Sequence, residues 1–130
     1  MMTIDEQSYP IVVVRSEGEL TLDDVQHFAQ TLEAILARPT PCGVIMISDE
    51  HSVTPEARST QARWMKQHKP RIAEICRGFA WVIRSPAQLL LYKPMIALQG
   101  KRMVGCPAAA FGDLDEATAW VRTQLAKSAV

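Results

Sequence analysis

Residues 42–47 read CGVIMI, an unbroken apolar run with turn-forming residues on both sides. Pro39 and Pro41 precede the run, and the polar stretch SDEHS follows it. A short apolar run bounded in this way is typical of a strand that is covered on both faces, as strands in parallel sheets are. We therefore predict that residues 42–47 form the central strand of a sheet.

The residues before this run predict two strands and a helix. Apolar and β-branched residues at 2–4 and 11–14 indicate two short strands that form a hairpin. Thr21 followed three positions later by Asp24 is close to a capping box, and apolar residues then recur at spacings of three and four. This pattern predicts a helix over residues 22–37.

A second helix and a further strand are predicted after the run. Thr54 and Pro55 are favourable residues for an N-cap and a first helical position, and the helical pattern continues to Cys76. Pro70 lies inside this pattern, and we expect it to kink or split the helix because proline lacks a backbone N–H and clashes with the preceding turn. Residues 79–83, FAWVI, indicate the next strand.

The last third of the chain repeats the alternation. Ser85 and Pro86 again give a cap and a proline, and the following residues 87–98 are apolar nearly all round. We predict a short strand at residues 103–106, with residues 110–111 as a further candidate. Next comes the clearest helix start in the chain, a capping box formed by Asp113 and Glu116.

The predicted order is β-β-α-β-α-β-α-β-α. Strands that alternate with helices predict an α/β fold with a mostly parallel sheet and right-handed crossovers, and the opening hairpin adds one antiparallel edge. A chain of 130 residues has the length of one domain, and we expect a single domain over residues 1–130.

Composition excludes some function classes. Fourteen basic residues balance 14 acidic ones, so no overall field favours nucleic acid, and we expect none as a partner. The start MMTIDEQSYP is unlike a signal peptide, and no apolar run reaches about 18 residues, so we expect a cytoplasmic protein without a membrane span.

The three cysteines, Cys42, Cys76 and Cys106, are far apart in sequence and outside any CxxC pattern. This spacing signals neither a disulfide framework nor a zinc site, and we interpret the three as buried small hydrophobic residues, with a reactive thiol as the alternative. We expect no metal and no cofactor.

The chain resembles the STAS domain family and its SEC14-like relatives, in particular small stand-alone bacterial proteins of this type. The resemblance covers the order of elements over nearly the whole chain. The segments that carry it are CGVIMIS at 42–48, WMKQHKPRIAEICRG at 64–78, FAWVIRS at 79–85 and FGDLDEATAWVRTQLA at 111–126. It implies a STAS-like sheet of four to five strands with helices mainly on one face.

In the anti-sigma-factor antagonists of this family, the loop after the central strand carries a phosphorylated serine in an Asp-Ser-Ser/Thr-Gly-like motif. The corresponding residues 48–54 read SDEHSVT, without the Asp-Ser pair and without the glycine, which argues against an antagonist. The simplest interpretation of this stretch is a helix cap after a solvated turn. The functional alternative is a partner-binding or phospho-acceptor site, whose candidates are Ser52, Thr54, Asp49, His51 and Arg58.

The apolar segment 87–98 also has two interpretations. It is too short to cross a bilayer, so the simpler prediction is a helix buried against the sheet. The alternative leaves part of it exposed as a homodimer interface or beside a pocket for a hydrophobic ligand, and the candidates are then Leu90, Leu91 and Met95.

These observations give an ordered set of hypotheses. The leading one is a non-enzymatic regulatory module that binds a protein partner through residues 48–54 and the following helix. The alternative is a carrier or sensor of a small apolar or lipid-like ligand held near residues 89–98. An enzyme comes third, because no catalytic residue pattern rises above chance. An enclosed apolar cavity of several hundred Å³ would favour the carrier.

Overall fold

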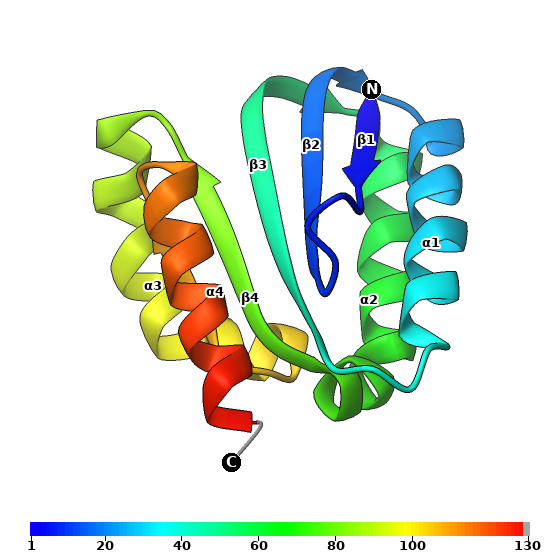
Figure 1. Cartoon of the computed structure of the whole chain (residues 1–130). Helices are drawn as coiled ribbons and strands as arrows, with labels where there is room; N and C mark the ends of the chain where they lie inside the picture. Colours follow the sequence, from blue (N-terminus) through cyan, green and yellow to red (C-terminus); the bar gives the residue numbers. More distant parts are fainter. Residues whose placement is uncertain (129–130) are drawn as a thin grey trace.

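Residues 1–128, which the computed structural model describes, form a mixed five-stranded sheet and four helices (Figure 1). For residues 48–51 and 128 the backbone alone is described. In chain order the elements are β1 (Met2–Asp5), β2 (Ile11–Leu20), α1 (Leu22–Leu36), β3 (Cys42–Val53), α2 (Pro55–Ile75), β4 (Cys76–Ile83), α3 (Pro86–Val104), β5 (Ala108–Phe111) and α4 (Leu114–Ser128). This order is the predicted one.

The strands lie side by side in the order β1-β2-β3-β4-β5. β1 is antiparallel to β2, whereas β2, β3, β4 and β5 are parallel, so the sheet has the predicted antiparallel edge. β3 is the central strand, and its Val44 pairs with Val12 on one side and Phe79 on the other. The prediction drawn from the run CGVIMI is therefore confirmed.

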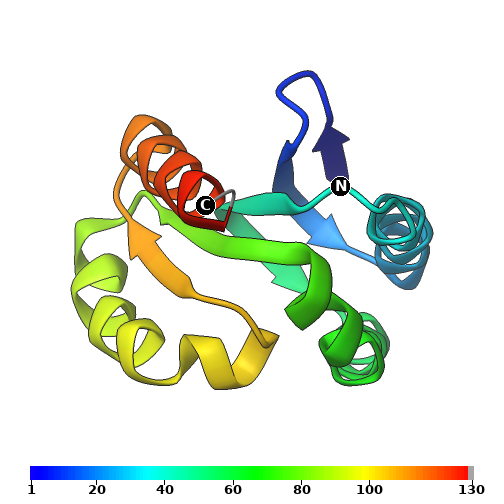
Figure 2. The same ribbon diagram turned by 60° about the horizontal axis from the view of Figure 1, so that its bottom comes forward.

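Helices cover the two faces of the sheet unequally (Figure 2). α1, α2 and α3 lie on one face and α4 on the other, which confirms helices mainly on one face. The larger core lies under α1 and α2 and includes Val14, Phe28, Leu32, Ile35, Val44, Trp64, Ile72 and Phe79. The smaller core lies under α4 and consists of Ile11, Ile45, Ile47, Ala80, Val82, Ala117 and Val121.

The predicted helix starts are formed by local hydrogen bonds. Thr21 accepts a bond from the Asp24 N–H at 3.4 Å, and the Asp24 carboxylate accepts the Thr21 N–H at 2.9 Å, which completes the capping box. Ser85 caps α3 by accepting the Gln88 N–H at 3.4 Å. Before α4, Asp113 accepts the Glu116 N–H at 2.8 Å.

The structure differs from two predictions about α2 and α3. We expected Pro70 to kink or split α2, and the proline does not split it, because α2 runs from Pro55 to Ile75 with Pro70 inside. Packing against α1, where the Phe28 and Trp64 rings lie 5.6 Å apart, supports α2 on the N-terminal side of the proline. The strand predicted at residues 103–106 is wrong, because α3 continues to Val104 and ends at Gly105 in the left-handed conformation (φ 91°).

Candidate functional site

The predicted loop at residues 48–54 is mostly strand, so this part of the prediction is wrong. β3 continues to Val53, which pairs with Leu20 at the end of β2. β2 and β3 stay paired beyond an irregularity between Ser16 and Gly18 of β2. Because β2 is long, it keeps the polar residues of β3 in an extended conformation. The segment therefore lies at one end of the sheet and leads directly into α2.

The candidate residues of this segment have different environments. Thr54 is the N-cap of α2, and its hydroxyl accepts the Ala57 N–H at 3.2 Å, so the helix-cap interpretation is confirmed. Ser52 and Arg58 are exposed at the same end of the sheet. The side chains of Asp49 and His51 lie outside the described residues, and whether Ser52 or Thr54 accepts a phosphate stays a prediction.

Helix α3 is the second region where candidates were predicted, and it is not buried against the sheet. Leu90, Leu91 and Met95 are 79%, 68% and 41% exposed. α3 contacts the rest of the chain through a narrow strip that includes Ile96, Gly100 and Val104, and the edge strand β5 beside it has four residues. The simpler prediction of a buried helix is therefore wrong, and the exposed alternative describes these side chains.

A hollow of about 360 Å³ lies between α2, α3 and the sheet. We call it the α2–α3 pocket. Its lining comes from all three parts of the fold and consists of Ser16, Leu20, Met46, Gln61, Ala62, Met65, Phe79, Trp81, Met103 and Val104. None of these residues carries a charge. The hollow is partly open to solvent, and its volume lies near the lower end of the range of small-molecule sites.

The polar groups of the α2–α3 pocket are few. Ser16 is 3% exposed and is the buried polar residue among those whose side chains the structure describes. Gln61 is half-buried on α2. A hydroxyl and an amide within an apolar lining can orient one neutral polar group of a ligand.

The α2–α3 pocket lies beside a different part of α3 from the predicted candidates for a hydrophobic ligand. The α2–α3 pocket takes Met103 and Val104 from the last turn of the helix, and neither Leu90, Leu91 nor Met95 lines it. The signal that could have found it is the methionines, since Met46, Met65 and Met103 line it from three elements. Methionine is flexible and polarisable, and it suits surfaces that adapt to different ligands.

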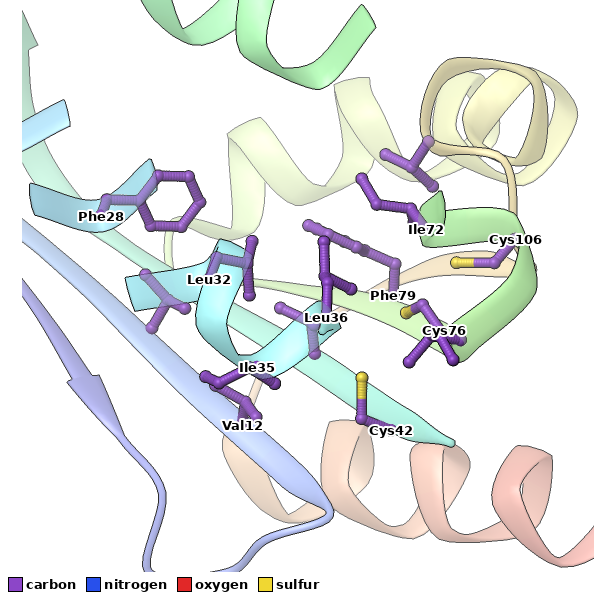
Figure 3. Close-up of a cluster of buried hydrophobic side chains, with 14 of the residues drawn as sticks. Val12, Phe28, Leu32, Ile35, Leu36, Cys42, Ile72, Cys76, Phe79 and Cys106 are labelled. Carbon is purple, nitrogen blue, oxygen red and sulfur yellow. The ribbon is translucent and has the colours of Figure 1, made fainter. Parts of the chain in front are cut away.

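The three cysteines lie together at one end of the larger core (Figure 3). Cys42 is at the start of β3 and pairs with Cys76 at the start of β4, while Cys106 follows α3. All three are free and buried, which confirms their interpretation as buried small residues. The pKa of Cys42 is raised by its hydrogen bond with Cys76 and by burial, and that of Cys76 is raised chiefly by its hydrogen bond with Cys106. Thiols in this state are poor nucleophiles at neutral pH.

The described part of the chain contains no group of three or more His, Cys, Asp or Glu side chains placed to hold a metal ion. None of its helices is both long enough and apolar enough to cross a membrane.

The topology defines a class, since a sheet with one antiparallel edge strand, four parallel strands and helices mainly on one face is the architecture of a STAS-like domain. A family model described as SpoIIAA-like matches residues 11–122. The chain therefore belongs to the SpoIIAA-like family.

The structural comparison agrees with this assignment. The chain is similar to the crystal structure of an uncharacterized protein of the DUF3478 family with a SpoIIAA-like fold, from Shewanella loihica. The two share 16% sequence identity over 93% of this chain and 92% of that chain, with a TM-score of 0.67. At this identity the likeness shows the fold alone. No curated protein matches the sequence.

Proposed function

We propose that this STAS-type module binds a small, neutral, mainly apolar ligand in the α2–α3 pocket. The observation that carries the proposal is the pocket itself, which has a volume of about 360 Å³ and is lined by uncharged and mostly apolar side chains. It is the alternative that the sequence left open, although the site lies at the opposite end of α3 from the predicted one.

The lining supports a neutral ligand. A charged group placed against this uncharged, apolar lining would lose part of its hydration without gaining a partner charge, and this loss opposes binding. The hydroxyl of Ser16 and the amide of Gln61 can satisfy one polar group. We infer a ligand with an apolar body and a single uncharged polar end.

The same lining supports binding rather than catalysis. The described residues around the α2–α3 pocket include neither a carboxylate, an imidazole nor a thiol that could act as a general base or nucleophile. Our proposal is therefore a non-enzymatic carrier or sensor that works in the cytoplasm.

Binding of a neutral apolar dye, N-phenylnaphthylamine, tests the proposal. The variant Ala62→Trp places a large ring in the α2–α3 pocket from an exposed position on α2, so it should fold normally and lose at least about tenfold in dye affinity. Its matched control is Ala119→Trp, an exposed alanine on α4 across the sheet. Undiminished binding by Ala62→Trp would contradict the proposal.

A second dye site on the exposed part of α3 has to be separated from the α2–α3 pocket. The variant Leu91→Gln changes a side chain that is 68% exposed and that does not line the pocket. Dye affinity should be unchanged in this variant. If Leu91→Gln rather than Ala62→Trp abolishes binding, the dye reports on the surface of α3 and the pocket proposal fails. Native mass spectrometry of protein from its own host then identifies any retained ligand.

The second proposed function is recognition of a protein partner at the end of the sheet where β3 leads into α2. It is supported by a hollow of about 410 Å³ over the first turns of α2, lined by Leu22, Pro55, Glu56, Ser59, Thr60 and Arg63. Exposed Ser52 and Arg58 lie at the same end. A partner captured by the native chain should be lost with Arg58→Glu and kept with Arg122→Glu on α4. Equal capture by both variants would exclude this surface.

A further inference from the structure

The exposed side of α3 has an unusual concentration of apolar side chains. Seven large hydrophobic residues are exposed in the described part of the chain, and six of them belong to α3. They are Leu90, Leu91, Tyr92, Met95, Leu98 and Met103. Leu90 and Leu98 are 79% and 86% exposed, so they contribute little to the core of the isolated chain. Met103 lines the α2–α3 pocket, and the other five lie outside it. A concentration of large apolar side chains at the surface marks an interaction site.

Helical periodicity arranges these residues in two neighbouring rows. Leu91, Met95 and Leu98 follow one another at spacings of four and three, and Arg102 continues their row after another four positions. Leu90 begins the second row, which continues with Pro94 and Ala97 and ends at Lys101. Each apolar row therefore ends with a basic residue in the last turn of the helix. We call the two rows together the α3 face.

The charged residues of α3 itself, Lys93, Lys101 and Arg102, all have the same sign. The stretch from Ile75 to Gly112 contains five basic residues and no Asp or Glu. The rest of the chain has nine basic and 14 acidic residues, so the zero net charge hides a basic segment in an otherwise acidic chain. The partner of the α3 face should accordingly combine an apolar interior with a negative surface.

We propose that the α3 face binds to the surface of an anionic lipid bilayer, with the leucines in the acyl region and Lys101 and Arg102 at the headgroups. Exposed leucines can enter the boundary between headgroups and acyl chains, and basic residues next to them are attracted to anionic lipids. A second copy of the chain would bring the same basic residues to the contact. A protein groove is less suited because leucine is under-represented among the residues that dominate protein interfaces. The inference goes beyond the proposed ligand and does not depend on it.

Vesicle flotation tests the inference. The native protein is mixed with vesicles of phosphatidylcholine, either pure or containing phosphatidylglycerol, at low and high salt. Binding is expected with the anionic vesicles and should weaken as salt screens the charges. Lys101→Gln with Arg102→Gln should lower the affinity about 30-fold, because each basic side chain near an anionic surface contributes about a fivefold step or slightly more. Leu91→Gln with Leu98→Gln should lower it by about tenfold or more.

The controls separate lipid binding from charge effects and from unfolding. Arg122→Gln with Lys127→Gln removes two exposed basic residues from α4, on the other face of the sheet, and should bind like the native chain. Each variant should keep the native urea midpoint, since all the substituted side chains are exposed.

Three results would overturn the inference. The first is a native protein that floats with neither vesicle, and the second is equal binding to neutral and anionic vesicles. The third is a dimer in light scattering that Leu91→Gln with Leu98→Gln dissociates while vesicle binding is absent, because the α3 face would then be a contact between copies of the chain.

Discussion

The close approach of β3 to α4 allows a quantitative test of how the smaller core is packed. A Cβ added at Gly43 would lie 2.2 Å from Cγ1 of Val121, whereas ordinary carbon contacts are about 3.5 to 4.0 Å. Val121 is fully buried, and its β-branched side chain has little rotamer freedom. Gly43→Ala must therefore displace α4 or the sheet, and we expect it to lower the free energy of unfolding by about 3 kcal/mol.

The variant Val121→Ala should relieve this clash. On its own it removes two buried methyl groups and should cost about 2 kcal/mol. In the double variant the two Cβ atoms would be 3.7 Å apart, an ordinary contact, and the new methyl group would occupy space that Val121 has vacated. The double variant should therefore be about as stable as Val121→Ala, and the coupling energy should be about 3 kcal/mol.

Urea unfolding followed by circular dichroism measures the four free energies of this cycle. The matched control is Gly43→Ala combined with Val25→Ala, because Val25 is also fully buried but lies on α1, across the sheet. These two substitutions should be additive. If Gly43→Ala and Val121→Ala are also additive within about 0.5 kcal/mol, the packing described here is wrong.

Further predictions concern the first helix and the thiols. Thr21→Ala should lower stability by about 0.5 to 2 kcal/mol in urea unfolding, because it removes the cap of α1. Hydrogen bonds from Thr21 hold the pKa of Asp24 below its usual value of 3.8. The stability that this carboxylate contributes is therefore present above its pKa in the unfolded chain, and it is lost as the pH falls through its pKa in the folded chain. An acid titration should show a smaller loss in Asp24→Asn than in the native chain, and equal losses would contradict this. Cys42, Cys76 and Cys106 should react with a disulfide reagent in urea and not in buffer, and rapid reaction of the native protein would show that they are accessible.

Features set by nearby residues could be predicted from the sequence. A cap needs a hydroxyl or carboxylate within three positions of a backbone N–H, and the predicted caps at Thr21, Thr54, Ser85 and Asp113 are all formed. The central strand could be predicted because its apolar run is uninterrupted.

Features set by distant residues could not be predicted in this way. The polar residues 48–53 are extended because β2 is long enough to pair with them, and nothing in their own sequence indicates that length. The exposure of Leu90 depends on a neighbouring strand of four residues, which leaves most of α3 without a surface to cover it. The α2–α3 pocket needs Met46, Met65 and Met103 from three elements, and its existence depends on their spacing in the fold.

The single helix on the second face has a consequence for synthesis of the chain. Ile45, Ile47, Ala80 and Val82 belong to β3 and β4, whereas the helix that covers them, α4, begins at Leu114. On the ribosome, α1 and α2 can cover their face of the sheet before synthesis is complete. The opposite face stays uncovered until the residues of α4 have emerged. A nascent or truncated chain that ends before α4 presents an apolar sheet to chaperones and to other chains, and this sheet is the surface on which such a chain aggregates.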